Sequence, residues 1–257
     1  MIFDTHAHYD DNRFDDDRSQ VLSILEEEGI KVMNASASLE SLQVVLEMTK
    51  NYKNVYGALG VHPSECREMR EEHIDFMRKH LRDDKIVAVG EIGLDYHYDD
   101  DVPKDIQKKW FITQLNLAKE MNMPVNIHSR DAAKDTFDIL SKEEYKGLTG
   151  IIHCFSNSME MAKEYVKLGY YIGIGGVVTF KNAKEIKEVV KTIPLDKLVI
   201  ETDCPYLAPT PYRGRRNSSV FLTYVIEEIA AIKEIDARTV EKVTFENAMK
   251  VYNIGEI

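Results

Sequence analysis

Cysteine is scarce in this chain of 257 residues, and the cysteines that are present form no pattern. Cys66, Cys154 and Cys204 lie far apart and include no C-x-x-C pair. An odd number of isolated thiols argues against a disulfide framework and against a thiolate zinc cluster. We therefore expect a reduced, cytoplasmic protein in which the thiols are incidental.

Long apolar runs and an excess of positive charge are also missing. No stretch approaches the roughly 20 apolar residues of a membrane span, and the opening MIFDTHAHYDD lacks the basic and apolar segments of a signal peptide. Lys and Arg number 33 against 44 Asp and Glu, a formal net charge of -11, with acids concentrated in residues 10–17 and 99–101. This balance argues against a surface that binds nucleic acid throughout, although a local basic patch is compatible with it.

Short apolar runs alternate with longer amphipathic segments along the whole sequence, and this alternation favours strands followed by helices. A single-domain (β/α)8 barrel over residues 1–257 fits eight such units, with closing helices in about 217–253, the second opening near Asp236. A doubly wound sheet is the alternative, but it would usually carry a Gly-rich phosphate loop where this chain reads T-H-A-H-Y-D-D-N. The expected strands are Ile2–His6, Lys31–Ser36, Val55–Gly60, Ile86–Glu91, Pro124–His128, Gly150–Cys154, Tyr171–Gly175 and Leu198–Asp203.

Ionisable residues gather at the carboxyl ends of these runs, which in a parallel barrel share the rim that carries the active site. His6 and His8 form an H-x-H pair on one face of a strand, because strand side chains alternate with period two. That pair alone is a weak signal, and a single histidine on an apolar run is commonly a core residue. Clustered imidazoles and carboxylates without a cation cost several kcal/mol, so the whole set indicates metal binding: His6, His8, Glu91, His128, His153 and Asp203.

Six nitrogen and oxygen ligands exceed the needs of one tetrahedral ion and suggest two divalent ions, such as Mg, Mn or Zn. Glu91 lies on the strand between the two groups of histidines and is the natural bridge. Asp203 could also accept the proton of the attacking water and return it to the leaving group. Besides Glu91, the first ion would be held by His6, His8 and Asp203 and the second by His128 and His153.

Several further side chains near the rim are candidates for substrate binding. Glu201 shares a face with Asp203 by the period-two rule, and would orient a ligand, contact the substrate or pair with a basic residue. The rings of Tyr96, Phe155 and Tyr206 could stack a base, although aromatic residues in loops commonly only pack. Substrate binding or turn stabilisation are the two interpretations for His62 and Asp95.

Basic residues on the same rim bear on the charge of the substrate. The loop P-Y-R-G-R-R-N places three arginines around a glycine that lets the backbone approach a ligand. Such a group suits an anion such as a phosphodiester, although a run of charge is usually only a solvated face. The candidates are Arg130, Lys181, Arg213, Arg215 and Arg216.

The sequence as a whole resembles the TatD-type metal-dependent deoxyribonucleases of the amidohydrolase-like barrels. The motifs F-D-T-H-A-H, G-V-H-P, G-E-I-G-L-D-Y, I-H-S-R-D-A, I-H-C-F-S, E-T-D-C-P-Y-L-A-P and R-G-R-R-N occur in the order of that family. The resemblance implies the same six metal ligands and a divalent-cation-dependent hydrolysis of DNA, often as a 3′ to 5′ exonuclease. Ser218 and Ser219 depart from the E-P of many members, which affects the loop shape and substrate preference.

We therefore expect a cytoplasmic, monomeric phosphodiesterase that cuts single-stranded or frayed DNA and has no membrane partner. Two other interpretations stay open. The same site could hydrolyse an ester or amide, as in an aminoacyl-tRNA deacylase or a small-molecule amidohydrolase. A barrel that only binds metal or nucleic acid is the non-catalytic alternative.

Overall fold

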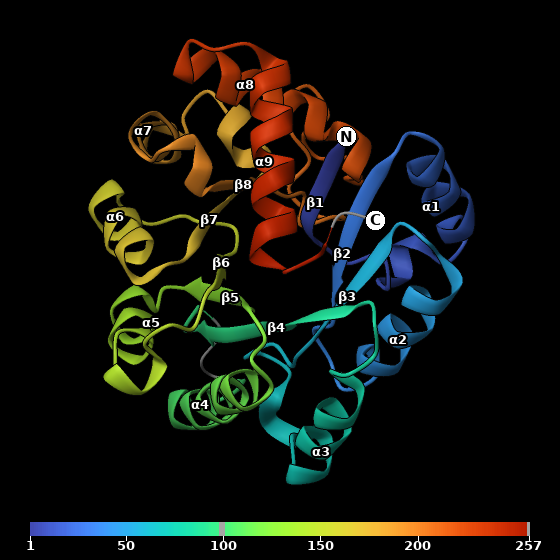
Figure 1. Cartoon of the computed structure of the whole chain (residues 1–257), viewed down its shortest axis with the longest axis vertical. Helices are drawn as coiled ribbons and strands as arrows, with labels where there is room; N and C mark the ends of the chain where they lie inside the picture. The colour runs from blue at the N-terminus through green and yellow to red at the C-terminus, as the bar shows by residue number, and fades with distance from the viewer. Residues whose placement is uncertain (98–100, 256–257) are drawn as a thin grey trace.

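Eight parallel strands form a barrel in the computed structural model, which describes residues 1–97 and 101–255 (Figure 1). The strands pair in chain order, and the amide of Asp203 donates to the carbonyl of His6 at 2.9 Å, which joins the last segment to the first. The expected (β/α)8 barrel is confirmed, and the alternative prediction of a doubly wound sheet is wrong. The strands are β1 Ile2–Ala7, β2 Ile30–Ala35, β3 Val55–Leu59, β4 Ile86–Asp95, β5 Val125–Arg130, β6 Gly150–Ile152, β7 Tyr171–Ile174 and β8 Leu198–Ile200.

Helices surround the barrel, one after each of the first seven strands (Figure 1). After β8 come two helices within the region expected to close the fold, and the side chain of Asp236 accepts the Thr239 amide as the N-cap of the second. Acidic residues 99 and 100 lie outside the described residues, as do residues 256 and 257. The helices are α1 Arg18–Glu27, α2 Ser41–Asn51, α3 Glu71–His80, α4 Lys104–Met121, α5 Ala133–Leu140, α6 Met159–Leu168, α7 Lys184–Thr192, α8 Leu222–Lys233 and α9 Ala237–Val251.

The barrel interior is packed with side chains and covered by the end of the last helix. Phe3 of β1 and Tyr56 of β3 belong to a buried apolar cluster that also contains Val251 and Tyr252 at the end of α9. The Tyr252 hydroxyl donates to the Thr5 carbonyl at 2.8 Å, so α9 is fixed to the inside of β1. Within the described ranges, no helix is both long and apolar enough to span a membrane.

Every strand ends at a different residue from the expected one, and the differences at β4, β6 and β8 bear most on the geometry of the site. β4 continues through Asp95, whereas β6 and β8 stop at Ile152 and Ile200. Cys154 and Asp203 have φ of 44° and 57°, in the left-handed region that ends a strand. The period-two argument that placed Glu201 and Asp203 on one strand face was therefore wrong, because both lie beyond β8.

Candidate metal centre

A cleft of about 710 Å³ opens at the carboxyl ends of the strands. Its lining includes His8 after β1, Glu91 of β4, His128 of β5, and the loop residues His153 and Asp203. These positions are far apart in the sequence, and the parallel order of the strands brings them to one rim. Here the structure assembles the residues that the sequence assigned to metal binding.

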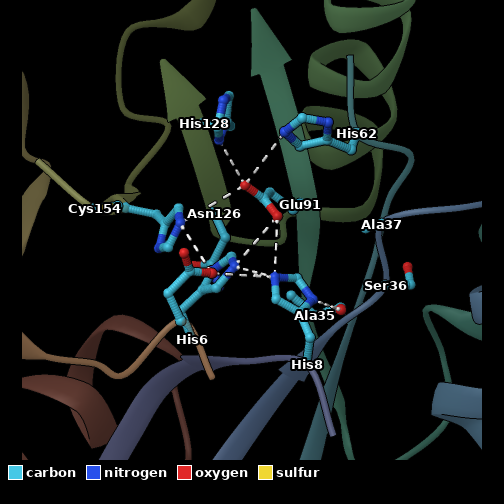
Figure 2. A network of polar contacts seen from close by, with 12 residues as sticks. His6, His8, Ala35, Ser36, Ala37, His62, Glu91, Asn126, His128 and Cys154 are labelled. Carbon is cyan, nitrogen blue, oxygen red and sulfur yellow. Dashed lines mark hydrogen bonds and ion pairs between the residues drawn. The ribbon is translucent and has the colours of Figure 1, made fainter. Parts of the chain in front are cut away.

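Glu91 lies in the middle of this cluster, with its two carboxylate oxygens facing different histidines (Figure 2). Oε2 lies 3.3 Å from His6 Nε2 and 3.4 Å from His8 Nε2. Oε1 lies 2.8 Å from His128 Nδ1 and 3.8 Å from His62 Nε2. A carboxylate in this position can bridge two cations, one for each oxygen.

His153 and Asp203 lie between the histidines that face the two oxygens of Glu91. The Nε2 atom of His153 is 3.8 Å from Glu91 Oε1 and 3.7 Å from Asp203 Oδ1. Asp203 Oδ1 is also 3.5 Å from His8 Nε2. His6, His8 and Asp203 thus present three donor atoms close together, and so do His6, Glu91 and His153.

The hydrogen bond of His8 decides which of its nitrogens is available to a cation. Its Nδ1 lies 2.9 Å from the carbonyl oxygen of Ala35, which can only accept, so Nδ1 carries a proton. In the neutral ring, Nε2 then has a free lone pair, and it lies 3.1 Å from His6 Nε2. Two nitrogens bound to one ion at about 2.0–2.1 Å lie about 3 Å apart, so the donor set fits a divalent cation.

The electrostatics of the cluster show how strongly these groups interact. Burial alone would raise the pKa of Glu91, but the imidazoles of His6 and His62 hold that pKa well below its ordinary value. Burial would lower the pKa of His8, and the carboxylates of Asp203 and Glu91 outweigh it and raise that pKa well above its ordinary value. Burial and the neighbouring His128 lower the pKa of His62 to about 3. Glu91 is therefore ionised, and a cation bound at His8 Nε2 would take the place of a proton there.

Glu201 lies beside the second ring nitrogen of His153. It is fully buried, its Oε1 lies 3.0 Å from His153 Nδ1, and the same atom accepts the Cys154 amide at 2.5 Å. A carboxylate beside the second nitrogen of a ligating histidine fixes the ring and its tautomer. Gly173 of β7 makes room for this group, because a Cβ at Gly173 would lie 2.4 Å from Glu201 Oε2. Glu201 is thus placed to orient a ligand, and its burial does not fit the expected substrate contact.

A second buried network, which the sequence did not reveal, supports the other side of the centre. Asp4 accepts the Thr202 amide at 3.0 Å and the hydroxyls of Thr202 and Ser219 at 2.6 Å each. The Ser219 hydroxyl also lies 2.9 Å from that of Tyr9. Thr202 precedes Asp203, so these bonds fix the loop that carries that carboxylate. The residues that depart from the family pattern, Ser218 and Ser219, thus take part in a structural network, since Ser218 Oγ also lies 3.2 Å from the Tyr9 hydroxyl.

Four of the residues expected to bind substrate line the cleft: His62, Asp95, Arg130 and Tyr206. His62 lies beside Glu91 and His128, where the three form another group of metal-type donors. Asp95 Oδ2 lies 3.1 Å from His128 Nε2, and the exposed Arg130 follows on the same strand. Arg130 therefore adds a positively charged side chain to the lining of the cleft.

The arginine-rich loop lies elsewhere. Arg213, Arg215 and Arg216 are exposed and do not belong to the cleft lining. The Arg216 guanidinium donates to Asp17 Oδ1 at 2.8 Å, and that of Arg213 lies 4.4 Å from the centre of the Phe180 ring. Asp17 and Phe180 hold the side chains of Arg216 and Arg213 outside the cleft lining, and the expected role of the three arginines in binding phosphate stays a prediction.

Of the other aromatic and basic candidates, one lines the cleft and the rest do not. The Tyr96 hydroxyl donates to Asp135 at 2.7 Å, and Phe155 is only 5% exposed, so neither ring faces the main cleft. Lys181 is exposed outside the cleft lining. Tyr206, by contrast, lines the cleft and is 46% exposed.

Comparison with known proteins agrees with the fold and the cluster. A family model described as TatD related DNase matches residues 3–253. The uncharacterized metal-dependent hydrolase YabD of Bacillus subtilis is 43% identical over 256 residues, which cover 99% of this chain and 100% of that protein. The uncharacterized metal-dependent hydrolase YcfH of Escherichia coli K12 is 33% identical over 258 residues, with 99% and 96% covered.

Solved structures give the same result. The crystal structure of YjjV, a TatD homolog from Escherichia coli K12, matches with a TM-score of 0.92 at 30% identity, covering 99% of this chain and 98% of that one. The organophosphorus hydrolase of Deinococcus radiodurans, with a TM-score of 0.65 at 12% identity, shares the fold alone.

The parallel barrel and the cluster at its rim define the class, that of metal-dependent hydrolase barrels. Within that class, the chain belongs to the TatD-related DNase family, because the family model and the relatives cover nearly all of it.

Proposed function

We propose that this protein is a deoxyribonuclease that hydrolyses DNA phosphodiesters with two divalent cations, as a 3′ to 5′ exonuclease. The observation that carries the proposal is the position of Glu91, with one oxygen toward His6 and His8 and the other toward His128. The family description supports DNA as the substrate. We further propose that the enzyme acts in the cytoplasm as a monomer on single-stranded or frayed ends.

In this proposal each side of the cluster holds one ion, which is Mg, Mn or Zn. When bound, the cations would lower the pKa of water and stabilise charge on the phosphoryl oxygens. Glu91 belongs to both sites. The remaining ligands are His6, His8 and Asp203 for the first ion and His128 and His153 for the second.

Asp203 is the proposed proton acceptor. Its side chain is 20% exposed and lines the cleft, so substrate and water can reach it. Despite burial, which raises it, the pKa of Asp203 is lowered by the neighbouring His8, and the carboxylate is ionised. Asp203 would take a proton from the attacking water at a carboxylate oxygen and return it to the leaving oxygen of the DNA.

The protein also has to hold the DNA backbone. Arg130 is exposed and lines the cleft beside His128. A guanidinium can bind a phosphate through two hydrogen bonds. One such contact next to the cations would hold a short stretch of backbone although the chain carries a net charge of -11.

Incubation of the pure protein with a 5′-labelled single-stranded 20-mer tests the proposal, with Mg or Mn and with EDTA. We expect a ladder of products that shorten stepwise from the 3′ end and require metal. Asp203→Ala should lose this activity, whereas Asp138→Ala, an exposed carboxylate that pairs with Lys134 on α5, should keep it.

Absence of metal-dependent cleavage, or equal activity of Asp203→Ala and the wild type, would overturn the proposal. If DNA stays intact while an amino acid is released from charged tRNA, the protein is a deacylase instead. Tight binding of DNA without turnover under every metal would favour the non-catalytic interpretation.

A further inference from the structure

Two large apolar side chains remain exposed at the mouth of the cleft. Tyr206 is 46% and Leu207 is 40% exposed, and both line the cleft. The other exposed large hydrophobic residues of the described chain, Met1, Ile24 and Ile235, are not among the lining residues. Adjacent apolar residues exposed at a polar rim are typical of a binding surface.

The Tyr206 ring is held in place from behind. The guanidinium carbon of Arg13 lies 4.0 Å from the ring centre. Asp11 fixes both partners, because Arg13 Nη2 donates to its Oδ2 at 2.9 Å and the Tyr206 hydroxyl donates to the same oxygen at 3.2 Å. Arg13 therefore covers one face of a preorganised ring that is 46% exposed and lines the cleft.

The backbone of Tyr206 is also bonded to the loop that carries Asp203. The amide of Tyr206 donates to the carbonyl of Asp203 at 2.9 Å. Tyr206 and Asp203 thus belong to one turn, and both line the same cleft. A nucleobase is the planar unit attached to a phosphodiester, and bases stack on tyrosine without strong sequence preference.

We propose that Tyr206, backed by Arg13 and fixed by Asp11, is the platform on which the nucleobase beside the scissile phosphodiester stacks. This inference rests on the proposed function and adds a specificity residue to it. Arg13 is neutralised by Asp11, so the platform recognises the base and not the phosphate charge. The contribution of Tyr206 should accordingly change little with salt, unlike that of a phosphate contact.

The test compares two single-stranded oligonucleotides that differ only in the 3′-terminal residue, a thymidine or an abasic tetrahydrofuran. We expect the wild type to cleave the thymidine substrate with a kcat/KM about 10-fold higher. Tyr206→Leu should lose this preference by lowering the thymidine value alone, and Tyr206→Phe should keep most of it. Arg13→Gln should weaken it about 2- to 3-fold, whereas Arg78→Gln, which removes an ion-paired arginine on α3, should not.

A second readout separates this inference from the proposed function. Fluorescence anisotropy of the same oligonucleotides, labelled at the 5′ end and measured in EDTA, should show a Kd that Tyr206→Leu weakens for thymidine and not for the abasic residue. If the wild type cleaves neither oligonucleotide, the nuclease proposal fails while this binding test still decides the platform. Equal losses on both oligonucleotides, or no preference in the wild type by either readout, would overturn the stacking role.

Discussion

A single methyl group added at Gly173 should disturb the metal centre from a distance. The Cβ of Gly173→Ala would lie 2.4 Å from Glu201 Oε2 and 2.7 Å from Cδ. Real Cβ contacts do not come this close, so the buried Glu201 carboxylate has to move. That carboxylate lies 3.0 Å from His153 Nδ1, and its displacement would change the orientation of His153.

The magnitude follows from packing and from the role of Glu201. Overpacking a closed site costs about 1–3 kcal/mol of unfolding free energy. Loss of the partner that orients a ligating histidine lowers metal affinity about 10- to 100-fold. We expect Gly173→Ala to show both effects, measured by urea unfolding and by calorimetric titration with Mn²⁺.

Gly175→Ala is the matched control on the same segment. A Cβ there would lie 3.5 Å from the Glu201 carbonyl oxygen, an ordinary contact, so both quantities should stay near wild type. In a Glu201→Ala background, Gly173→Ala should cost little more, because the two changes act on one contact. Wild-type metal affinity in Gly173→Ala, or equal losses in Gly175→Ala, would show that Glu201 does not orient His153 for metal binding.

Three further perturbations have equally direct readouts. Glu91→Ala should reduce bound metal from two ions per chain to one or none, as elemental analysis would show; two ions in the variant would contradict the bridging role. Ser219→Ala should lower the unfolding free energy in urea by about 1–3 kcal/mol, because buried Asp4 and Tyr9 lose a partner, and unchanged stability would contradict this. Arg130→Gln should raise KM for DNA and flatten its salt dependence at constant kcat, whereas an unchanged salt slope would exclude a phosphate contact.

The sequence predicted the barrel because its strands are buried on both faces. Such strands read as continuous apolar runs, as in Tyr171–Ile174 and Leu198–Ile200, and amphipathic helices separate them. The gathering of the site residues at one rim followed from the parallel arrangement of the strands alone. The ends of β6 and β8 could not be predicted, because periodicity carries no information about the left-handed backbone of Cys154 and Asp203.

The side-chain partners of charged residues could not be predicted from the sequence either. Nothing in R-G-R-R-N indicates that Arg216 pairs with Asp17, near the start of α1. A tight contact such as that of Gly173 with Glu201 also depends on which strands become neighbours. Asp4 did leave a signal: it stands two residues before His6 in D-T-H-A-H, at the same spacing that separates His6 from His8.

Anomalous diffraction from crystals soaked in Mn²⁺ would locate the cations around Glu91. We expect two peaks about 3.5–4 Å apart, one beside each carboxylate oxygen of Glu91. The first should contact His6 and His8, and the second should contact His128. A single peak, or two peaks that do not share Glu91, would contradict a two-metal centre bridged by Glu91.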